Sequence, residues 1–463
     1  MNPNAADGGA NTAAAGTAAA GHRLAGFVRS KLRWNRLFAA VSYLKSALWT
    51  VPFVAIALEL VVTPILHRLD AWLGWNFAGL AVSGAQAIDQ TVITLTLSFL
   101  VFTFGSLLVA IQVAGGQMTP RVIATALLRD NVVRYSVGLY TFTLVFTVGA
   151  LNRLETSVHQ LVALAVGALG VVCIANFLFL IDYAARLLRP VSIVARIGND
   201  GIAVIKAVYP DPTERVVAET AGLRGRLGLP ARIVWHSGSS EIVLAVDLPT
   251  LVAEAKRCDG VVELVPQVGD FVAADEPLFA LYGGAKAASE LTLRTTVAFG
   301  PERTLEQDPM FAFRILVDIG LKALSPAIND PTTAVLALDQ VHRLLRVLGK
   351  RSLRPDVVRD DAGQPRVIFR TPNWEDFVHV ACNEIRSCGA GNVQIARRMR
   401  AMLENLVLTL PAHRHAVLNE ELDALDRTIE KLFGLASDLA LARIPDVQGL
   451  GGSPTPAVTD REG

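Results

Sequence analysis

One polar stretch in the second half of the chain could hold catalytic groups. Lys322 to Ala334 read KALSPAINDPTTA and include Ser325 and Asn329, and Arg314 precedes them. A hydroxyl, an amide and a guanidinium that converge in a cytosolic cleft could bind and polarise a substrate. However, neither a histidine nor a cysteine lies nearby in the sequence to act with Ser325.

A turn between two helices explains the same stretch more simply. Asp308-Pro309 and Asp330-Pro331 share one pattern, an aspartate that can cap a helix followed by a proline suited to the first helical position. Pro326 blocks continuation of the first helix, while serine and asparagine side chains commonly bond the backbone of a turn. We therefore expect helices that begin at Asp308 and Asp330, and we favour a turn over catalysis.

A second candidate lies in the apolar first half of the chain. Glu59, in AIALELVVTP, is an acidic residue inside an apolar run. Such a residue suggests an ion site or a proton relay, as one part of a polar path through a membrane. An internal pair with Arg68 or Arg153, serving packing alone, explains it equally well, and both interpretations stay open.

Three further candidates for a polar path or hinge lie in VAIQVAGGQMTPRVI. Gln112 is a polar residue within an apolar run, and Gly115 and Gly116 can adopt positive φ and stop a helix. Pro120 can then open the next helix at its first turn. The glycine pair would be a hinge in a channel or transporter, although a plain helix stop accounts for it as well.

Long apolar runs must position the residues of the first half. Of the 463 residues, 52% are hydrophobic and 18% charged, and the long charge-free runs fall almost entirely before residue 182. A spanning helix needs about 20 apolar residues to cross the hydrocarbon core. Four stretches qualify, namely Tyr43 to Leu66, Ile88 to Val113, Val133 to Leu151 and Val158 to Ile181.

The distribution of basic residues predicts the orientation of these spans. Arginines and lysines gather before the first span, between the second and third, and after the fourth. The other two connections carry only Arg68 and Arg153. By the positive-inside rule both termini face the cytoplasm.

Small and hydroxyl side chains share one face of the second span and one face of the third. Such residues usually mark contact between helices, because they allow close approach, although they could also line a polar path. The residues are Thr91, Thr94, Ser98, Gly105, Gln112 and Gly116 in the second span, and Ser136, Tyr140, Thr143 and Thr147 in the third.

The fold class expected is an α-helical membrane protein of four spans with a cytosolic α+β region. The segments expected are disordered tails at 1–35 and 443–463, a transmembrane domain at 36–190, a connecting helix and linker at 191–228, a small β-rich module at 229–306 and a helical bundle at 307–442. A strand-like PRVIFRTP interrupts the bundle. VPQVGDFVAADEPL is similar to the turn-rich half of a biotinyl or lipoyl barrel, but it lacks the lysine for attachment, so a packing or assembly role is expected.

Several other kinds of site are not expected. GAKAAS lacks the order of a phosphate-binding loop, and the net charge of +1 leaves no basic surplus for nucleic acid. His379 and Cys382 share one side of a helix, but a zinc site needs three or four good ligands. We therefore expect no cofactor, no metal, no nucleic-acid partner and no enzyme activity.

Several motifs resemble a known family. AIQVAGGQMTPRVI, the LRD that follows, RTLEQDPMFAFRILVDIGLKALSPAINDPTTA and GAGNVQIARRM resemble the bacterial predicted membrane proteins of domain of unknown function 2254, over nearly all of residues 35 to 440. The resemblance implies a four-span protein of the bacterial inner membrane with a large cytosolic domain. It implies no activity and no functional residues.

Two functions remain as expectations. The first is an oligomeric channel or transporter in the lipid bilayer for an unknown ion or small solute, with a cytosolic assembly or regulatory domain, because four spans enclose little of a pore alone. The second is a non-transporting membrane scaffold or sensor whose cytosolic domain binds a partner or ligand. A homo-oligomer is expected for the first.

Overall fold

The computed structural model describes residues 34–73, 81–119, 130–154, 159–187, 189–212, 223–353 and 357–451. The chain divides into two compact units. Within the described residues, the first unit takes in 34–43, 223–308 and 357–371, and the second takes in 44–212, 309–353 and 372–451.

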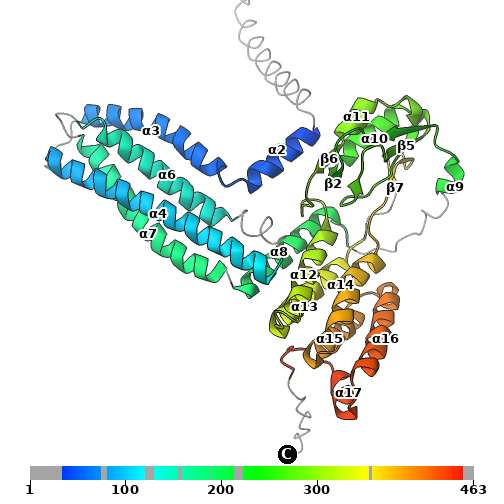
Figure 1. The fold of residues 1–463 in the computed structure, drawn as a ribbon. Helices are drawn as coiled ribbons and strands as arrows, with labels where there is room; N and C mark the ends of the chain where they lie inside the picture. The colour runs from blue at the N-terminus through cyan, green and yellow to red at the C-terminus, as the bar shows by residue number, and fades with distance from the viewer. Residues whose placement is uncertain are drawn as a thin grey trace, which may run out of the picture. The chain divides into compact units, whose positions relative to one another are not determined.

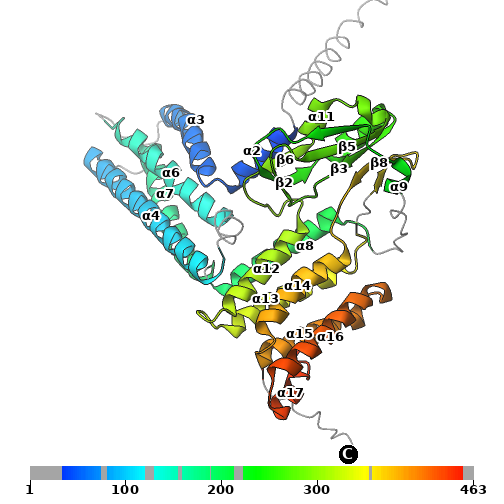
Figure 2. The ribbon, with the colours of Figure 1, turned by 45° about the vertical axis from the view of Figure 1, so that its right-hand side comes forward.

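Four long apolar helices of the second unit could cross a membrane. They are α3 (Thr50–Leu73), α4 (Val82–Gln117), α6 (Asn131–Leu151) and α7 (Gln160–Leu187). They lie side by side in Figures 1 and 2. Phe53, Leu60, Val101 and Leu178 are each more than 60% exposed on their outer faces, as expected for side chains that meet lipid. The four apolar spans predicted from the sequence are confirmed, with somewhat different ends.

Helix α6 is the centre of this group, because it contacts α3, α4 and α7. An added Cβ at Gly138 would come 2.5 Å from Val51 Cγ1, so glycine lets α3 and α6 approach closely. The packing face predicted for the third span is confirmed, since all four of its polar residues are buried. These are Ser136, Tyr140, Thr143 and Thr147.

The packing face predicted for the second span is wrong within the four helices. Thr91, Thr94 and Ser98 are exposed, and each hydroxyl donates to the backbone carbonyl four residues earlier. Thr96 and Thr103, on the other side of α4, are buried instead. The apolar side chains around the predicted face gave no signal of which side meets the other helices.

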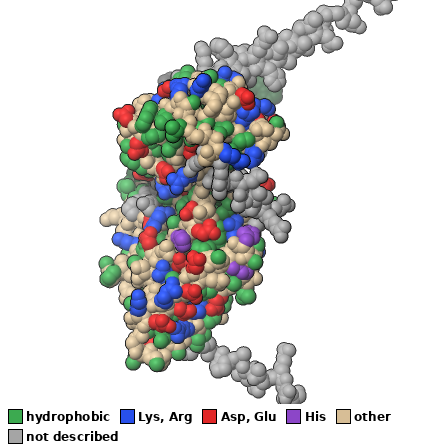
Figure 3. All heavy atoms as spheres, turned by 90° about the vertical axis from the view of Figure 1, so that its right-hand side faces the viewer, with side chains coloured by type: hydrophobic (Ala, Val, Ile, Leu, Met, Phe, Trp, Pro, Cys, Tyr) green, Lys and Arg blue, Asp and Glu red, His purple; other side chains and the backbone are tan. Residues whose placement is uncertain are grey.

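A bundle of helices follows in the same unit. It contains α8 (Pro190–Val208), α12 (Pro309–Ala323), α13 (Pro331–Leu348), α14 (Trp374–Gly389), α15 (Val393–Thr409), α16 (His415–Leu432) and α17 (Ala436–Ala442). Helix α8, expected as a connection, packs against α12 and α13. The last part of the bundle consists of two helices, α16 and α17, which are separated by residues 433–435. Acidic and basic side chains are interspersed over the bundle on the face shown in Figure 3.

Residues 443–451, expected as the start of a tail, pack on α15. Arg397 Nε donates to the carbonyl of Ile444, and Gln394 donates to that of Gly449. The Asp446 carboxylate accepts from three backbone N–H groups, which hold its pKa below the ordinary value although burial opposes this. The predicted tail at 1–35 falls almost entirely outside the described residues.

The first unit is built on two small sheets. The larger has the order β1-β5-β3-β8-β7 and the smaller the order β4-β2-β6. The strands are β1 (Arg232–Trp235), β2 (Glu241–Val246), β3 (Gly260–Leu264), β4 (Phe271–Val272), β5 (Pro277–Gly283), β6 (Val297–Gly300), β7 (Val357–Arg359) and β8 (Pro365–Phe369). The strand-like PRVIFRTP, expected to interrupt the bundle, supplies β8, which pairs in parallel with β3.

Short helices complete the first unit. They are α2 (Trp34–Ser46), α9 (Leu223–Leu227), α10 (Leu248–Arg257), η2 (Gly284–Ala287) and α11 (Glu290–Thr295). Leu251 of α10, Phe279 of β5 and Leu293 of α11 are fully buried in one core. Trp34 and Phe38 of α2 pack against a small cluster of β2 and β6. Gly269 adopts a φ of +93°, and a Cβ there would come 2.2 Å from the Arg303 guanidinium.

Candidate functional site

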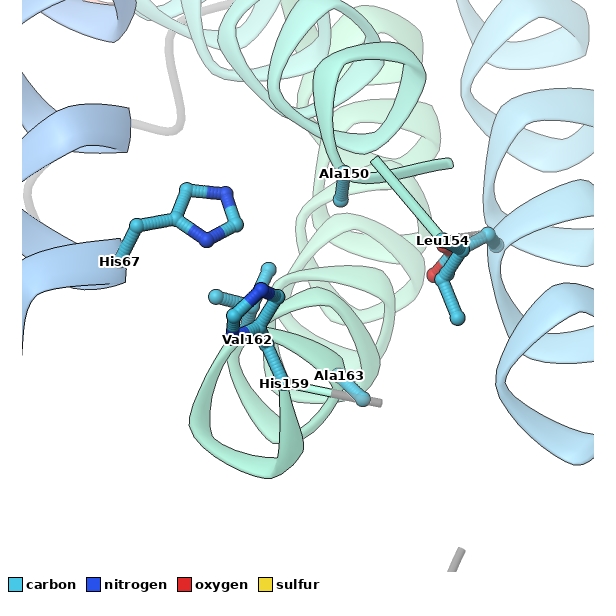
Figure 4. Close-up of a pocket in the computed structure, with 7 residues that line it drawn as sticks. His67, Ala150, Leu154, His159, Val162 and Ala163 are labelled. Carbon is cyan, nitrogen blue, oxygen red and sulfur yellow. The ribbon is translucent and has the colours of Figure 1, made fainter. Parts of the chain in front are cut away.

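Polar side chains from α3, α4 and the start of α7 meet at one end of the four apolar helices. This end joins the last turns of α3 and α6 to the first turns of α4 and α7, because successive helices run in opposite directions. A pocket lies there, and Figure 4 shows the His67 ring reaching from α3 toward His159. The pocket is lined by His67, Asp89, Ala150, Leu154, His159, Val162 and Ala163.

Asp89 is the most unusual residue of this pocket. It lies in the second turn of α4, inside the apolar span, and is 1% exposed. Neither of its carboxylate oxygens accepts a hydrogen bond from any described residue. A lone charged carboxylate buried in this way is costly, so it must be neutralised by a proton or by a cation.

His159 is held by an aspartate from another helix. Its Nδ1 lies 2.8 Å from Asp70 Oδ2, and Asp70 Oδ1 accepts from the backbone N–H of Leu161 at 2.8 Å. Asp70 is 9% exposed as a residue, so this contact is largely shielded from solvent. Because a carboxylate accepts, we assign the proton to Nδ1, which leaves the second ring nitrogen of His159 as a base.

His67 lies beside His159. Its ring meets the His159 ring edge to face, with centroids 4.7 Å apart. The buried Nε2 of His67 has no hydrogen-bond partner among the described residues. Arg153, just beyond the end of α6, acts on His67 electrostatically together with His159 and Asp70.

Glu59, the candidate from the sequence, lies further along α3. It is 5% exposed, and its Oε1 accepts from the Thr63 hydroxyl at 2.8 Å. A Cβ at Gly149 would come 3.3 Å from the same oxygen, so the carboxylate lies directly against α6. Glu59, Thr63 and His67 repeat every four residues, which places all three on one face of α3.

The other membrane candidates lie at the opposite end of α4 from the pocket. Gln112 and Gly116 are exposed, and Gly115 is partly buried. Helix α4 continues through both glycines to Gln117, and neither has positive φ. The helix stop predicted at the glycines is therefore wrong, because the backbone stays helical through them. Pro120 lies outside the described residues.

The candidates in the second half of the chain, Arg314, Ser325 and Asn329, do not share one site. The Arg314 guanidinium bonds Asp318 and Glu384, and it holds the pKa of Glu384 below its ordinary value. The Ser325 hydroxyl donates to the carbonyl of Lys322 at 2.7 Å, and Asn329 has a φ of +50°. These two residues belong to the predicted turn.

The predicted starts of the two helices around that turn are confirmed. Helix α12 begins at Pro309 and α13 at Pro331, and Asp330 caps α13 by accepting from the Thr333 N–H at 3.0 Å. Asp308 accepts two hydrogen bonds from the Arg303 guanidinium, at 2.8 and 2.6 Å. Among the described residues, no group of three or more histidine, cysteine or acidic side chains could hold a metal ion.

A different buried aspartate lies at the far end of the membrane helices. Asp130 is fully buried and caps α6 through the N–H groups of Val132 and Val133. It also accepts from the Tyr183 hydroxyl at 2.5 Å and from Arg196 Nη1 at 2.8 Å. One carboxylate thus joins the start of α6 to the end of α7 and to α8.

The residues of the pocket do not stand out in the sequence. His67 falls just outside the first expected span and Asp70 lies in the connection that follows it, where polar residues are ordinary, while His159 is the second residue of the fourth expected span. Asp89 is the second residue of an expected span, where it resembles an interface residue. A usable signal existed, since four antiparallel spans bring these residues to the same side of a membrane.

The fold and its four apolar helices define a predicted membrane protein. The chain matches the family described as "Predicted membrane protein (DUF2254)" over residues 45–405, and it belongs to that family. The resemblance found in the sequence is therefore confirmed.

Named relatives come from mycobacteria. Uncharacterized protein Rv1290c of Mycobacterium tuberculosis and Uncharacterized protein Mb1321c of Mycobacterium bovis are each 27% identical over 427 residues, covering 88% of this chain and 81% of theirs. No solved structure matches the chain at a significant level.

Proposed function

We propose that this protein conducts or transports an ion or small solute, and that Asp89 is the binding group. The observation that carries the proposal is a carboxylate buried to 1% exposure in a membrane helix, without a hydrogen-bond partner among the described residues. Ionisable residues inside membrane segments are costly and commonly mark ion or proton pathways. A group kept only for packing would be expected to have donors around it.

Polar groups continue from the pocket toward the other end of the helices. Glu59 follows His67 on one face of α3, about 12 Å along the axis at ~1.5 Å per residue. The buried polar face of α6 continues from Gly149, beside Glu59, to Asp130. Its members are Thr147, Thr143, Tyr140 and Ser136. These residues supply hydroxyl groups along the length of the four apolar helices.

We propose that the protein lies in a bacterial inner membrane with both termini in the cytoplasm. The basic connections predict this orientation by the positive-inside rule. The pocket with Asp89 then faces the outer side, and Asp130 and α8 face the cytoplasm. The soluble parts would act in assembly or regulation, and no enzyme activity is proposed for them.

We propose that subunits associate through the outer face of α4. Gln112 places an amide on an exposed face of an apolar helix, and a Cβ at Gly105 would meet nothing within 4 Å. A polar group and small residues on one face favour contact between helices. Gly105→Cys should cross-link into dimers or larger species in membranes, whereas cysteine at the exposed Leu178 of α7 should give far less product. Equal cross-linking at the two positions would contradict this interface.

Ion flux in liposomes tests the proposed function. Purified protein is compared with protein-free vesicles for Na⁺, K⁺, Cl⁻ and H⁺ movement. Asp89→Asn should lower the flux by about tenfold or more, because the amide has no ionisable proton and lacks the negative charge that attracts a cation. Asp182→Asn is the matched control, since Asp182 is an exposed aspartate on α7 that pairs with Arg186. Correctly folded protein that moves none of the four ions would contradict the proposal and favour the scaffold or sensor.

A further inference from the structure

We infer that the transported ion is a proton, which enters through the Asp70–His159 pair and passes by His67 to Asp89. This inference rests on the proposed function and names its substrate and its entrance. It uses groups from three separate elements, α3, α4 and the start of α7, that the fold brings into one pocket.

The lining of the pocket argues against a metal cation. A bound cation must exchange its hydration shell for several oxygen ligands held close together. Among the residues that the structure describes, Asp89 supplies the carboxylate of the pocket lining, and besides the two histidines the lining is aliphatic, namely Ala150, Leu154, Val162 and Ala163. A proton needs a single carboxylate oxygen, which Asp89 provides.

The Asp70–His159 pair has the form of a proton entrance. The His159 side chain is 38% exposed and the Asp70 side chain only 10%, so the histidine reaches water while its carboxylate partner is shielded. His159 can accept a proton from hydronium at the ring nitrogen that Asp70 does not bond, which releases one water molecule. The neighbouring carboxylate stabilises the imidazolium that forms.

His67 is the second imidazole of the pocket. Its ring centroid lies 4.7 Å from that of His159, and both rings line the pocket of Asp89. The charged or titratable groups that act on His67 are His159 before α7, Arg153 after α6 and Asp70 of α3, and Asp89 of α4 lines the same pocket. Arg153 disfavours a lasting positive charge on His67, so the proton passes on to the Asp89 carboxylate, which becomes the neutral acid. Both imidazoles return to their neutral form.

Proton flux across a range of pH tests the inference. Liposomes containing a pH-sensitive dye and the full-length protein are given a K⁺ diffusion potential. Asp89→Asn should lower proton flux about tenfold or more, and Asp89→Glu should restore it, because glutamate keeps the ionisable group. Asp70→Asn should shift the pH profile of the flux toward lower pH, because protonated His159 loses its anionic partner. A residue that served only for packing would lower the flux without shifting the profile.

The outcomes separate the inference from the proposed function. A proton flux that follows Asp89 and whose pH profile moves with Asp70→Asn supports both. Na⁺, K⁺ or Cl⁻ flux that depends on Asp89 without proton flux would overturn the inference and keep the proposed function. Proton flux unchanged by both Asp70→Asn and His159→Gln would overturn the entrance. Absence of all flux from folded protein, checked by gel filtration and circular dichroism, would overturn both.

Discussion

Asp130 and Asp89 are both buried aspartates near ends of the apolar helices, yet their surroundings are opposite. Asp130 accepts hydrogen bonds from two backbone N–H groups, from Tyr183 and from Arg196. Asp89 accepts none from the described residues. A carboxylate with four donors stabilises the fold, whereas a carboxylate without donors costs stability and is retained where an ionisable group is needed. Under the proposed function, the comparison separates a structural end of the four apolar helices from a functional one.

The largest effect on stability is expected at Asp130. Asp130→Ala should lower the free energy of unfolding by about 3 kcal/mol, because it leaves the buried donors around it unpaired. Thermal unfolding in detergent measures the loss. A change below about 1 kcal/mol would show that the four hydrogen bonds contribute little. Asp130 would then not be a stabilising residue, and its contrast with Asp89 would be lost.

Asp89→Asn should have the opposite effects, a large loss of flux and little change in stability. The flux should fall by about tenfold or more, while the free energy of unfolding should change by less than about 1 kcal/mol or rise, because no hydrogen bond is lost. Flux and unfolding are measured on the same preparation. If this variant unfolds as readily as Asp130→Ala, Asp89 is a structural residue and the contrast between the two ends disappears.

Arg196→Gln measures how much one of the four donors to Asp130 contributes to stability. Asp130 would keep its bonds to the α6 backbone and to Tyr183, so the expected loss is about 1–2 kcal/mol, for one hydrogen bond to a charged group. Chemical unfolding measures this loss. The double variant with Asp130→Ala should lose less than the sum of the two single losses, because the pair is shared. Additive losses would show that the two residues act independently.

Thr63→Val should have a smaller effect. It removes the hydroxyl that donates to Glu59 while keeping nearly the same volume, and should cost about 1 kcal/mol of stability. Glu59 Oε1 then loses this hydrogen bond but keeps its charge, so the flux should change less than in Asp89→Asn. A flux loss equal to that of Asp89→Asn would move the main binding group from Asp89 toward Glu59.

His342, in helix α13, offers a pH control away from the four apolar helices. His342 bonds Asn405 and Arg398, and burial, followed by the charge of Arg398, lowers its pKa from the ordinary value of 6.5. The neutral form is therefore favoured by folding, so its contribution to stability is full above pH 6.5 and is lost as the pH falls below that value. His342→Gln should flatten this part of the unfolding profile. An unchanged acid profile in the variant would assign the loss to other groups.

The sequence predicted the helices well because their signals are local. Apolar runs defined the four spans, and Asp-Pro pairs defined the starts of α12 and α13. The side of α4 that packs could not be predicted, because apolar residues surround it. The parallel pairing of β8 with β3 was missed for a related reason, since about a hundred residues of chain separate the two strands.

The candidate site was predicted only in part, because it depends on tertiary contacts. Glu59 could be recognised from its apolar neighbours, whereas Asp89, His67 and His159 become related only when the ends of the helices meet. The donors that distinguish Asp130 from Asp89 also come from distant parts of the chain, such as Tyr183 and Arg196. A sequence pattern shows that an aspartate is present, and the packed structure shows whether donors surround it.

Infrared difference spectroscopy tests the central claim most directly, because the C=O stretch of a protonated carboxylic acid is separate from carboxylate bands. Wild-type protein in lipid is compared at acidic and neutral pH with Asp89→Asn and Asp182→Asn. We predict that one component of the carboxylic-acid band, present in the wild type and in Asp182→Asn, is missing in Asp89→Asn, while the other carboxyl groups contribute equally in all three proteins. A band of equal size in all three proteins would contradict the assignment of Asp89 as the group that binds the proton.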